Sequence, residues 1–246
     1  YSRMSFIVAY PLQKMEMVLD AHVRAHDFFG GLCGRGIYDN LKTVVTKIFK
    51  GKEREFNARF LECSSHYLFD VEACTPAAGW EKGQVERQVQ TLRKGFFLPR
   101  LSFASFDALN VYLHDRLIAY AKTKMHPEKR GSTIYAVFEE EREFLRKTTL
   151  PFDACLAQEV RVSPQCLVSY GRNRYSVPCA YANRSVQLRA YAGHIRFYAD
   201  GHCIAEHTRV FGRDKTICDP LHYLPVLERK PGALRNGLPF REWRLA

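Results

Sequence analysis

The stretch Gly79-Trp80-Glu81-Lys82-Gly83-Gln84-Val85-Glu86-Arg87 decides the fold when it is taken together with Tyr38-Asp39-Asn40. The earlier segment has the pattern of a strand that ends on an aspartate, and the later one that of a loop opening a helix with Glu86 near its start. Carboxylates are the oxygen ligands that magnesium takes in proteins. In a basic chain, this pair predicts a divalent-metal site for cutting and joining nucleic acid.

The composition is that of an ordinary globular protein with a basic bias. The chain has 246 residues, of which 46% are hydrophobic and 26% charged, enough for one large domain or two modest ones. No run approaches the length of a membrane-spanning helix. The formal net charge of +11 favours polyanionic partners, among which the phosphate backbone of nucleic acid is the commonest.

Cysteines and histidines give no metal signature of their own. The eight cysteines are scattered singly without a C-x-x-C pair, so we expect reduced thiols rather than a structural zinc. His22 and His26 have the spacing that zinc metalloproteases use, but Val23 stands where the glutamate of that motif would follow. We therefore expect an ordinary histidine pair.

The first 150 residues alternate between strand and helix patterns. The predicted strands cover residues 2–10, 35–39 and 67–74, and the predicted helices cover residues 13–29, 55–66, 80–94, 106–124 and 133–146. This order predicts an α/β module.

From about residue 158 the hydrophobic pattern changes to the alternation that is typical of short strands. They are predicted over residues 160–162, 166–170, 174–177, 185–190, 194–198 and 203–207. Turn signals such as Ala192-Gly193 and Asp200-Gly201 separate them. We expect a domain boundary near residue 150 and a small β-barrel after it.

Three longer segments carry a specific resemblance. They are YDNLKTVV (38–45), HYLFDVEACTPAAGWEKGQVERQVQTLRKGFF (66–97) and DPLHYLPVLERKPGALRNGLPF (219–240). Together they resemble a transposase of the DDE or retroviral-integrase superfamily, over essentially the whole chain. The pattern is most similar to the large transposase of two-gene bacterial insertion sequences, whose second gene encodes an AAA+ ATPase helper.

The resemblance implies the fold class and its division along the chain. We expect an α/β, ribonuclease-H-like integrase core, incomplete at its N-terminus, followed by a small all-β barrel. The expected parts are the core over residues 1–128, a helical linker over 129–157, the barrel over 158–212 and an irregular basic tail over 213–246.

The resemblance also implies a catalytic, metal-binding triad of Asp, Asp and Glu. Asp39 matches its second member, and Glu86 matches its third within the G-x-V-E pattern of residues 83–86. Glu81 is the rival for the third position, although it precedes the Gly83 that normally stands before the glutamate. Two Mg²⁺ (or Mn²⁺) ions are the expected cofactors of the intact enzyme.

The first aspartate of the triad is expected on a strand that precedes residues 2–10. The upstream candidates, Asp20 and Asp27, fall in the predicted helix over residues 13–29, which is the wrong element. We therefore expect the chain alone to be catalytically inert.

Basic and amide side chains around the glutamate are candidates for contact with DNA. In the predicted helix, Val85, Val89, Leu92 and Phe96 form the expected core stripe, so the remaining positions face outward. The expected DNA-binding residues are Lys42, Lys82, Arg87, Gln90, Arg93 and Lys94.

The implied function is Mg²⁺-dependent cleavage at transposon 3′ ends and strand transfer into target DNA. The expected partners are DNA, further copies of the chain and a separate AAA+ ATPase, in the cytoplasm of a bacterium and without a membrane. Two rival functions stay open at this stage. The chain is a non-catalytic DNA-binding or assembly remnant, or it belongs to a plain ribonuclease-H-type nuclease that makes no joined product.

Overall fold

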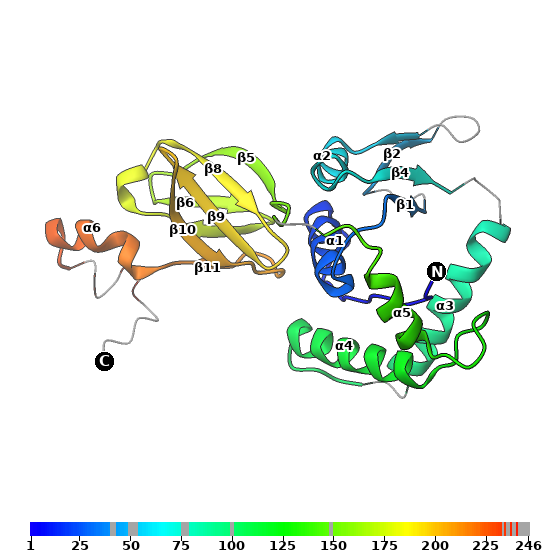
Figure 1. Ribbon diagram of the computed structural model, residues 1–246. Coiled ribbons are helices and arrows are strands. Elements are labelled where there is room, and N and C mark those ends of the chain that lie inside the picture. Colours follow the sequence, from blue (N-terminus) through cyan, green and yellow to red (C-terminus); the bar gives the residue numbers. More distant parts are fainter. Residues whose placement is uncertain are drawn as a thin grey trace. The chain divides into compact units, whose positions relative to one another are not determined.

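The computed structural model describes residues 1–39, 43–48, 54–74, 79–98, 101–147, 150–232, 234, 237 and 240. The chain divides into two compact units, Tyr1–Ala154 and Cys155–Ala246 (Figure 1). The architecture is mixed α/β, as expected, with the helices concentrated in the first unit. Among the described residues, no helix is both long and apolar enough to cross a bilayer.

The first unit contains five of the described α-helices and two pairs of short strands. The helices are α1 (Met15–Phe29), α2 (Ala58–Tyr67), α3 (Gly79–Phe97), α4 (Phe106–Thr123) and α5 (Ile134–Arg142). The strands are β1 (Arg35–Tyr38), β2 (Val45–Ile48), β3 (Arg54–Phe56) and β4 (Asp70–Ala73). β1 and β4 run parallel, whereas β2 and β3 form an antiparallel pair.

The helices begin where local sequence provides a cap. Asn57, Ser105 and Thr133 each accept a hydrogen bond from a backbone N–H of the first turn, which satisfies a donor that the helix leaves unpaired. α1 ends at Gly30, whose φ of 72° is left-handed and favours glycine. α3 and α4 then pack through a shared cluster, which contains the buried residues Leu92, Phe96, Leu113 and Leu117.

The predicted strand over residues 2–10 is wrong. The segment has no regular secondary structure, and helices supply its hydrogen bonds instead of a neighbouring strand. The amide of Asn110 on α4 accepts from Ala9 N at 2.7 Å and donates to Ala9 O at 3.1 Å. Gln88 on α3 donates to Arg3 O at 3.0 Å. Side-chain amides therefore hold this segment in place of a ladder of strand bonds.

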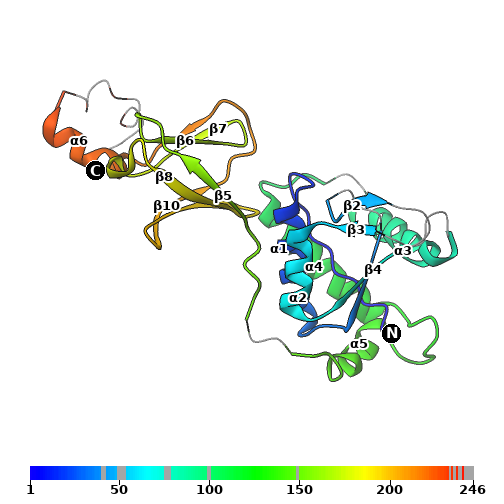
Figure 2. The same ribbon diagram turned by 90° about the horizontal axis from the view of Figure 1, so that it is seen from above.

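The second unit contains two sheets that share one core. Its strands are β5 (Leu156–Arg161), β6 (Leu167–Tyr170), β7 (Asn173–Ser176), β8 (Ser185–Ala190), β9 (His194–Ala199), β10 (His202–Thr208) and β11 (Thr216–Ile217). One sheet has the order β10-β9-β8-β5 and the other has the order β11-β7-β6, in which β6 and β7 lie side by side (Figure 2). Tyr175, Leu188, Ile195 and Phe197 from both sheets are buried in the common cluster.

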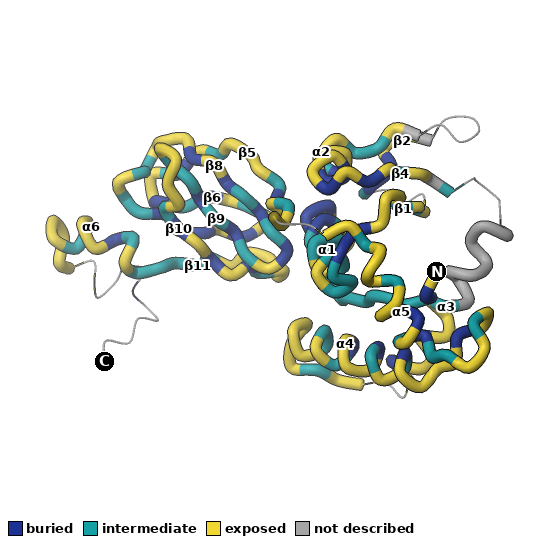
Figure 3. Tube along the Cα trace, in the orientation of Figure 1, coloured by how far each residue is buried: buried dark blue, intermediate teal, exposed yellow. Residues whose placement is uncertain are grey.

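The predicted closed barrel is wrong. Within residues 155–232 no hydrogen-bonded ladder joins the two sheets, so each sheet keeps its own edge strands. The strands still alternate between buried and exposed side chains, because each sheet covers the core with only one face (Figure 3). After β11 come a 3₁₀ turn at Pro220–Tyr223 and the short helix α6 (Leu224–Arg229).

Candidate functional site

Asp39 stands directly after β1, at the end of the strand where the parallel neighbour β4 also ends. The register pairs Tyr38 with Ala73, and Cys74 N donates to Tyr38 O at 2.9 Å. Asp39 itself is exposed. Because the carboxyl ends of parallel strands meet at one sheet edge, whatever follows β4 starts close to the strand that carries Asp39.

Tyr38 and His22 fix the end of β1. His22 donates from Nδ1 to Val18 O at 2.7 Å, so its Nε2 accepts from the Tyr38 hydroxyl at 3.1 Å. The Tyr38 ring also packs edge-on against Phe60, with 4.9 Å between centroids. Burial raises the pKa of Tyr38 and lowers the pKa of His22, which keeps both groups neutral near pH 7. The strand end is thus anchored by uncharged groups.

Glu86 lies within α3, the helix that follows β4. Its side chain, with those of Glu81, Lys82 and Arg87, falls outside the described residues, as does all of Lys42. The structure therefore places the helix that carries Glu86 after the partner strand of β1 and leaves the distance to Asp39 open.

The last turns of α3 separate buried from exposed positions. Gln90, Arg93 and Lys94 are exposed. Of the predicted core stripe, Leu92 and Phe96 are buried, whereas Val89 is 47% exposed, so the stripe is narrower than predicted. The three polar side chains are accessible to a ligand.

The donor chemistry of the strand edge fits a magnesium ion in part. Asp39 is an exposed carboxylate, which is the ligand type that Mg²⁺ takes. In the part of the chain that the structure describes, no group of three or more His, Cys, Asp or Glu side chains is arranged to hold one ion. A complete ligand set therefore needs further carboxylates, and Glu86 on α3 is the candidate that the G-x-V-E pattern of residues 83–86 gives.

The chain is similar to known proteins over almost its whole length. A transposase of Aminobacter aminovorans is 48% identical over 98% of this chain and 48% of its own length. The transposase for insertion sequences IS1326/IS1353 of Pseudomonas aeruginosa is 47% identical over the same shares. The chain resembles insertion-sequence transposases.

More distant relatives and a family match agree with this resemblance. The transposase for insertion sequence element IS21 of Pseudomonas aeruginosa is 32% identical over 93% of this chain and 59% of its own length. Residues 148–219 match the family described as Mu transposase, C-terminal domain, which covers β5 to β11. The predicted resemblance to these transposases is confirmed. The chain spans about half the length of the first two relatives.

Two other groups of polar side chains in this chain have a structural role. The rings of His22 and His26 lie edge-on, 6.2 Å apart, within the aromatic cluster around α1. In the second unit the hydroxyl of Ser176 donates to His222 Nδ1 at 2.8 Å, and His222 Nε2 lies 3.8 Å from Asp219. Ser176 is fully buried, so this serine–histidine–aspartate contact fastens the segment after β11 to β7.

Proposed function

We propose that the protein containing this chain is a DNA transposase that cleaves transposon 3′ ends and transfers them into target DNA. The supporting observation is the parallel pair of β1 and β4, with Asp39 directly after the first strand and Glu86 on the helix after the second. Two carboxylates brought together at one sheet edge would be suited to divalent-cation chemistry on a phosphodiester. On this proposal the first unit is a ribonuclease-H-like core.

In this proposal Asp39 and Glu86 hold two Mg²⁺ ions together with a third carboxylate, as in the Asp, Asp and Glu triad that the resemblance implies. When bound, the ions supply charge stabilisation at the phosphate and lower the pKa of an oxygen nucleophile. The anchored end of β1 supports this role, because the Tyr38 hydroxyl next to Asp39 in the chain is hydrogen-bonded to His22. The exposed side chains of Gln90, Arg93 and Lys94 would position the DNA by contacts with its backbone.

The resemblance adds partners to the proposal. DNA is the substrate, further copies of the chain assemble on paired ends, and a separate AAA+ ATPase assists. The net charge of +11 supports the choice of a polyanionic substrate.

The test uses a version of the protein that spans the length of its transposase relatives, with DNA carrying the ends of its element. Glu86→Gln and Asp39→Asn should each lower 3′-end cleavage and strand transfer by at least about 100-fold, because each removes a charged metal ligand. Binding to the same DNA should be retained.

Glu81→Gln is the matched control, since it removes one charge from the same helix. It should cleave and join normally. Full strand transfer by Glu86→Gln would overturn the assignment, and activity lost in Glu81→Gln instead would move the ligand to that residue. Cleaved DNA without a joined product would favour a hydrolytic nuclease.

A further inference from the structure

Two segments of the second unit share a four-residue pattern. Gly171-Arg172-Asn173-Arg174 forms the turn after β6 and the start of β7, and Gly212-Arg213-Asp214-Lys215 leads into β11. They are about forty residues apart in sequence, yet the fold places them side by side. Asp214 N donates to Arg172 O, and Arg174 N donates to Lys215 O, each at 2.9 Å. The parallel pairing of β11 with β7 continues this contact.

Asn173 locks the two segments together. Its side chain is 1% exposed, and its Nδ2 donates to Val210 O at 2.9 Å and to Gly212 O at 3.0 Å. Its Oδ1 accepts from Lys215 N at 3.0 Å. A buried amide that satisfies several backbone groups gives a rigid support. The residues on either side of Asn173 alternate to the opposite face, so Arg172 and Arg174 are exposed.

The result is a basic strip, defined as Arg172, Arg174, Arg213 and Lys215. All four side chains are exposed, and the exposed Asp214 stands between Arg213 and Lys215 in the sequence. In the described part of the chain, none of the four forms an ion pair. Like charges held together without counterions repel one another, so an arrangement of this kind favours an anionic ligand.

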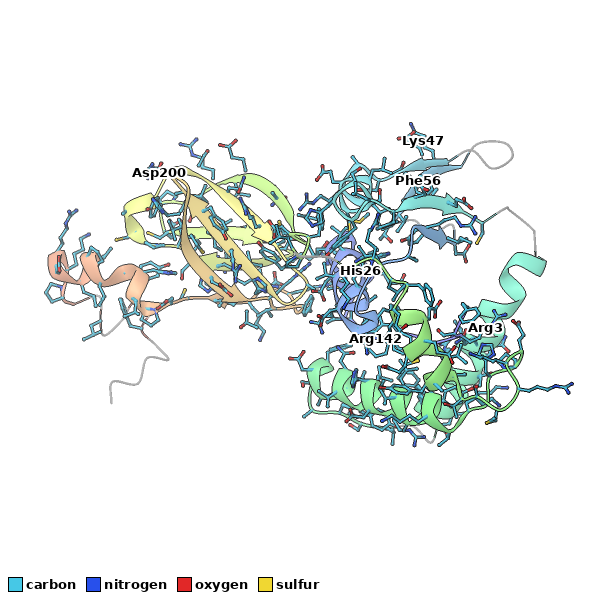
Figure 4. All side chains as sticks on the ribbon, viewed as in Figure 1. Arg3, His26, Lys47, Phe56, Arg142 and Asp200 are labelled. Atoms are coloured by element: carbon cyan, nitrogen blue, oxygen red, sulfur yellow. The ribbon has the colours of Figure 1, made fainter. Side chains whose placement is uncertain are left out.

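Arginines elsewhere in the same unit are already engaged. Arg184 is 3.2 Å from Asp200, which is labelled in Figure 4, and Arg196 is 2.8 Å from Glu206. The Arg189 guanidinium lies 4.4 Å from the centre of the Tyr198 ring. A ligand that displaced these contacts would lose as well as gain interactions, whereas the four residues of the basic strip have no ion pair with any described residue to break.

We propose that the basic strip binds the phosphate backbone of double-stranded DNA. The inference deepens the proposed function, because it takes DNA as the partner, but it needs neither the metal site nor catalysis. Four exposed cations on two neighbouring segments that are rigidly held suit the closely spaced phosphates of a duplex. Contacts of this kind position a duplex without reading its sequence.

The experiment measures binding of the full 246-residue chain to a short blunt duplex of mixed sequence, over a range of salt concentrations. The test variant is the triple Arg174→Gln, Arg213→Gln, Lys215→Gln. Arg172 is left in place because its φ of 66° makes substitution there a backbone change as well. The affinity at about 0.1 M salt should fall at least about tenfold, and the log–log salt slope should shrink by about 2 to 3.

The matched control is the triple Arg184→Gln, Arg189→Gln, Arg196→Gln, which removes the same charge from the other sheet. It should bind nearly as tightly as the parent chain. Equal losses in both triples would mean that only net charge matters, and no loss in either would mean that the DNA lies elsewhere. Either result overturns the proposal.

A second pair of variants tests the basic strip with changes that should strengthen its binding to DNA. Asp214 and Asp200 both have positive φ, at 58° and 50°, which asparagine tolerates well. Asp214→Asn should tighten duplex binding more than Asp200→Asn, although both raise the net charge equally. The reverse order would overturn the proposal. A strip triple that binds anionic vesicles more weakly but binds duplex DNA as tightly as the parent chain would also overturn it.

These outcomes are separate from those of the cleavage test. If the strip triple loses DNA binding and only Glu86→Gln loses cleavage, both proposals are supported. A strip without effect would leave the metal-site proposal standing.

Discussion

In the second unit every second residue of β8 is buried, as are Ile195 and Phe197 of β9, whereas in the first unit β1 buries no residue fully. Leu188 and Phe197 are completely buried between the two sheets, but Ile37 in β1 is 60% exposed. The difference teaches how each unit is held together. The second unit excludes water from a core between two sheets, whereas the first buries apolar side chains chiefly on its helices, such as Leu19, Phe60 and Leu113.

The comparison also bears on where each proposed activity lies. The candidate metal ligand Asp39 stands at the accessible end of the poorly covered sheet. The basic strip stands on β7 and the segment before β11, whose inward residue Tyr175 belongs to the closed core. Chemistry on a reacting phosphate needs an open edge, while a surface that only holds DNA gains from a rigid support.

The largest expected effect tests the core of the second unit. Phe197→Ala should lower the free energy of unfolding by about 3–5 kcal/mol, because a fully buried ring is lost and a cavity is left behind. Urea unfolding, with hydrogen exchange of peptides from β8 to β10 as the local probe, measures the change. Exchange in α1 of the first unit should stay unchanged if the two units are held independently.

Tyr198→Ala is the control for this prediction. Tyr198 is the next residue along β9, and its ring contacts Arg189 on the outer face of the sheet. Its removal should cost about 1 kcal/mol or less, since a partly exposed cation–π contact contributes little. Equal costs at Tyr198 and Phe197 would contradict the two-faced description of this sheet.

The next prediction tests the side-chain hydrogen bonds that hold residues 1–10 in the first unit. Asn110→Ala removes both hydrogen bonds with Ala9, which are 2.7 and 3.1 Å long, and should cost about 1–3 kcal/mol. Hydrogen exchange of residues 1–10 should rise most. Asn110→Asp keeps the acceptor for Ala9 N but cannot donate to Ala9 O, so it should fall between the parent and the alanine variant. An unchanged segment in both variants would mean that apolar packing alone holds it.

Local signals in the sequence predicted the helices well. The predicted helices over residues 13–29 and 106–124 appear as α1 and α4 with nearly the same ends, since apolar spacing and capping residues act within a few positions. The strand over residues 2–10 was wrong because alternation identifies a face and not a pairing partner. The closed barrel was wrong for the same reason, as closure depends on which distant strands pair.

The candidate sites show the same limit. The position of Asp39 at a strand end and of Glu86 on a helix follows from nearby residues, but their separation depends on the whole sheet edge. The basic strip was missed although Arg172 and Arg213 stand in the same Gly-Arg-Asx pattern. Only the contact between β7 and β11 brings those two patterns together.

The smallest expected effect concerns acid and the aromatic cluster of the first unit. His26, labelled in Figure 4, packs edge-on against Tyr67 with 4.4 Å between centroids. Burial, with a contribution from neighbouring His22, lowers the pKa of His26 to about 4. The unfolded chain, with a histidine pKa of about 6.5, binds the proton more readily, so the folded unit loses stability as the pH falls from about 6.5 towards 4. The stability that a neutral His26 contributes is fully present above that range.

Urea unfolding near pH 7 and near pH 5, with exchange in α1 as the local probe, measures this loss. His26→Phe should reduce the acid sensitivity of the first unit, because phenylalanine takes up no proton and still packs against Tyr67. His66→Gln is the control, since His66 is exposed and its removal should leave the pH dependence unchanged. Burial lowers the pKa of His207 in the second unit as well, so acid should weaken that unit in all three proteins. If the first unit of His26→Phe keeps its full acid sensitivity, a residue other than His26 takes up the proton. His22 would then be the next residue to replace.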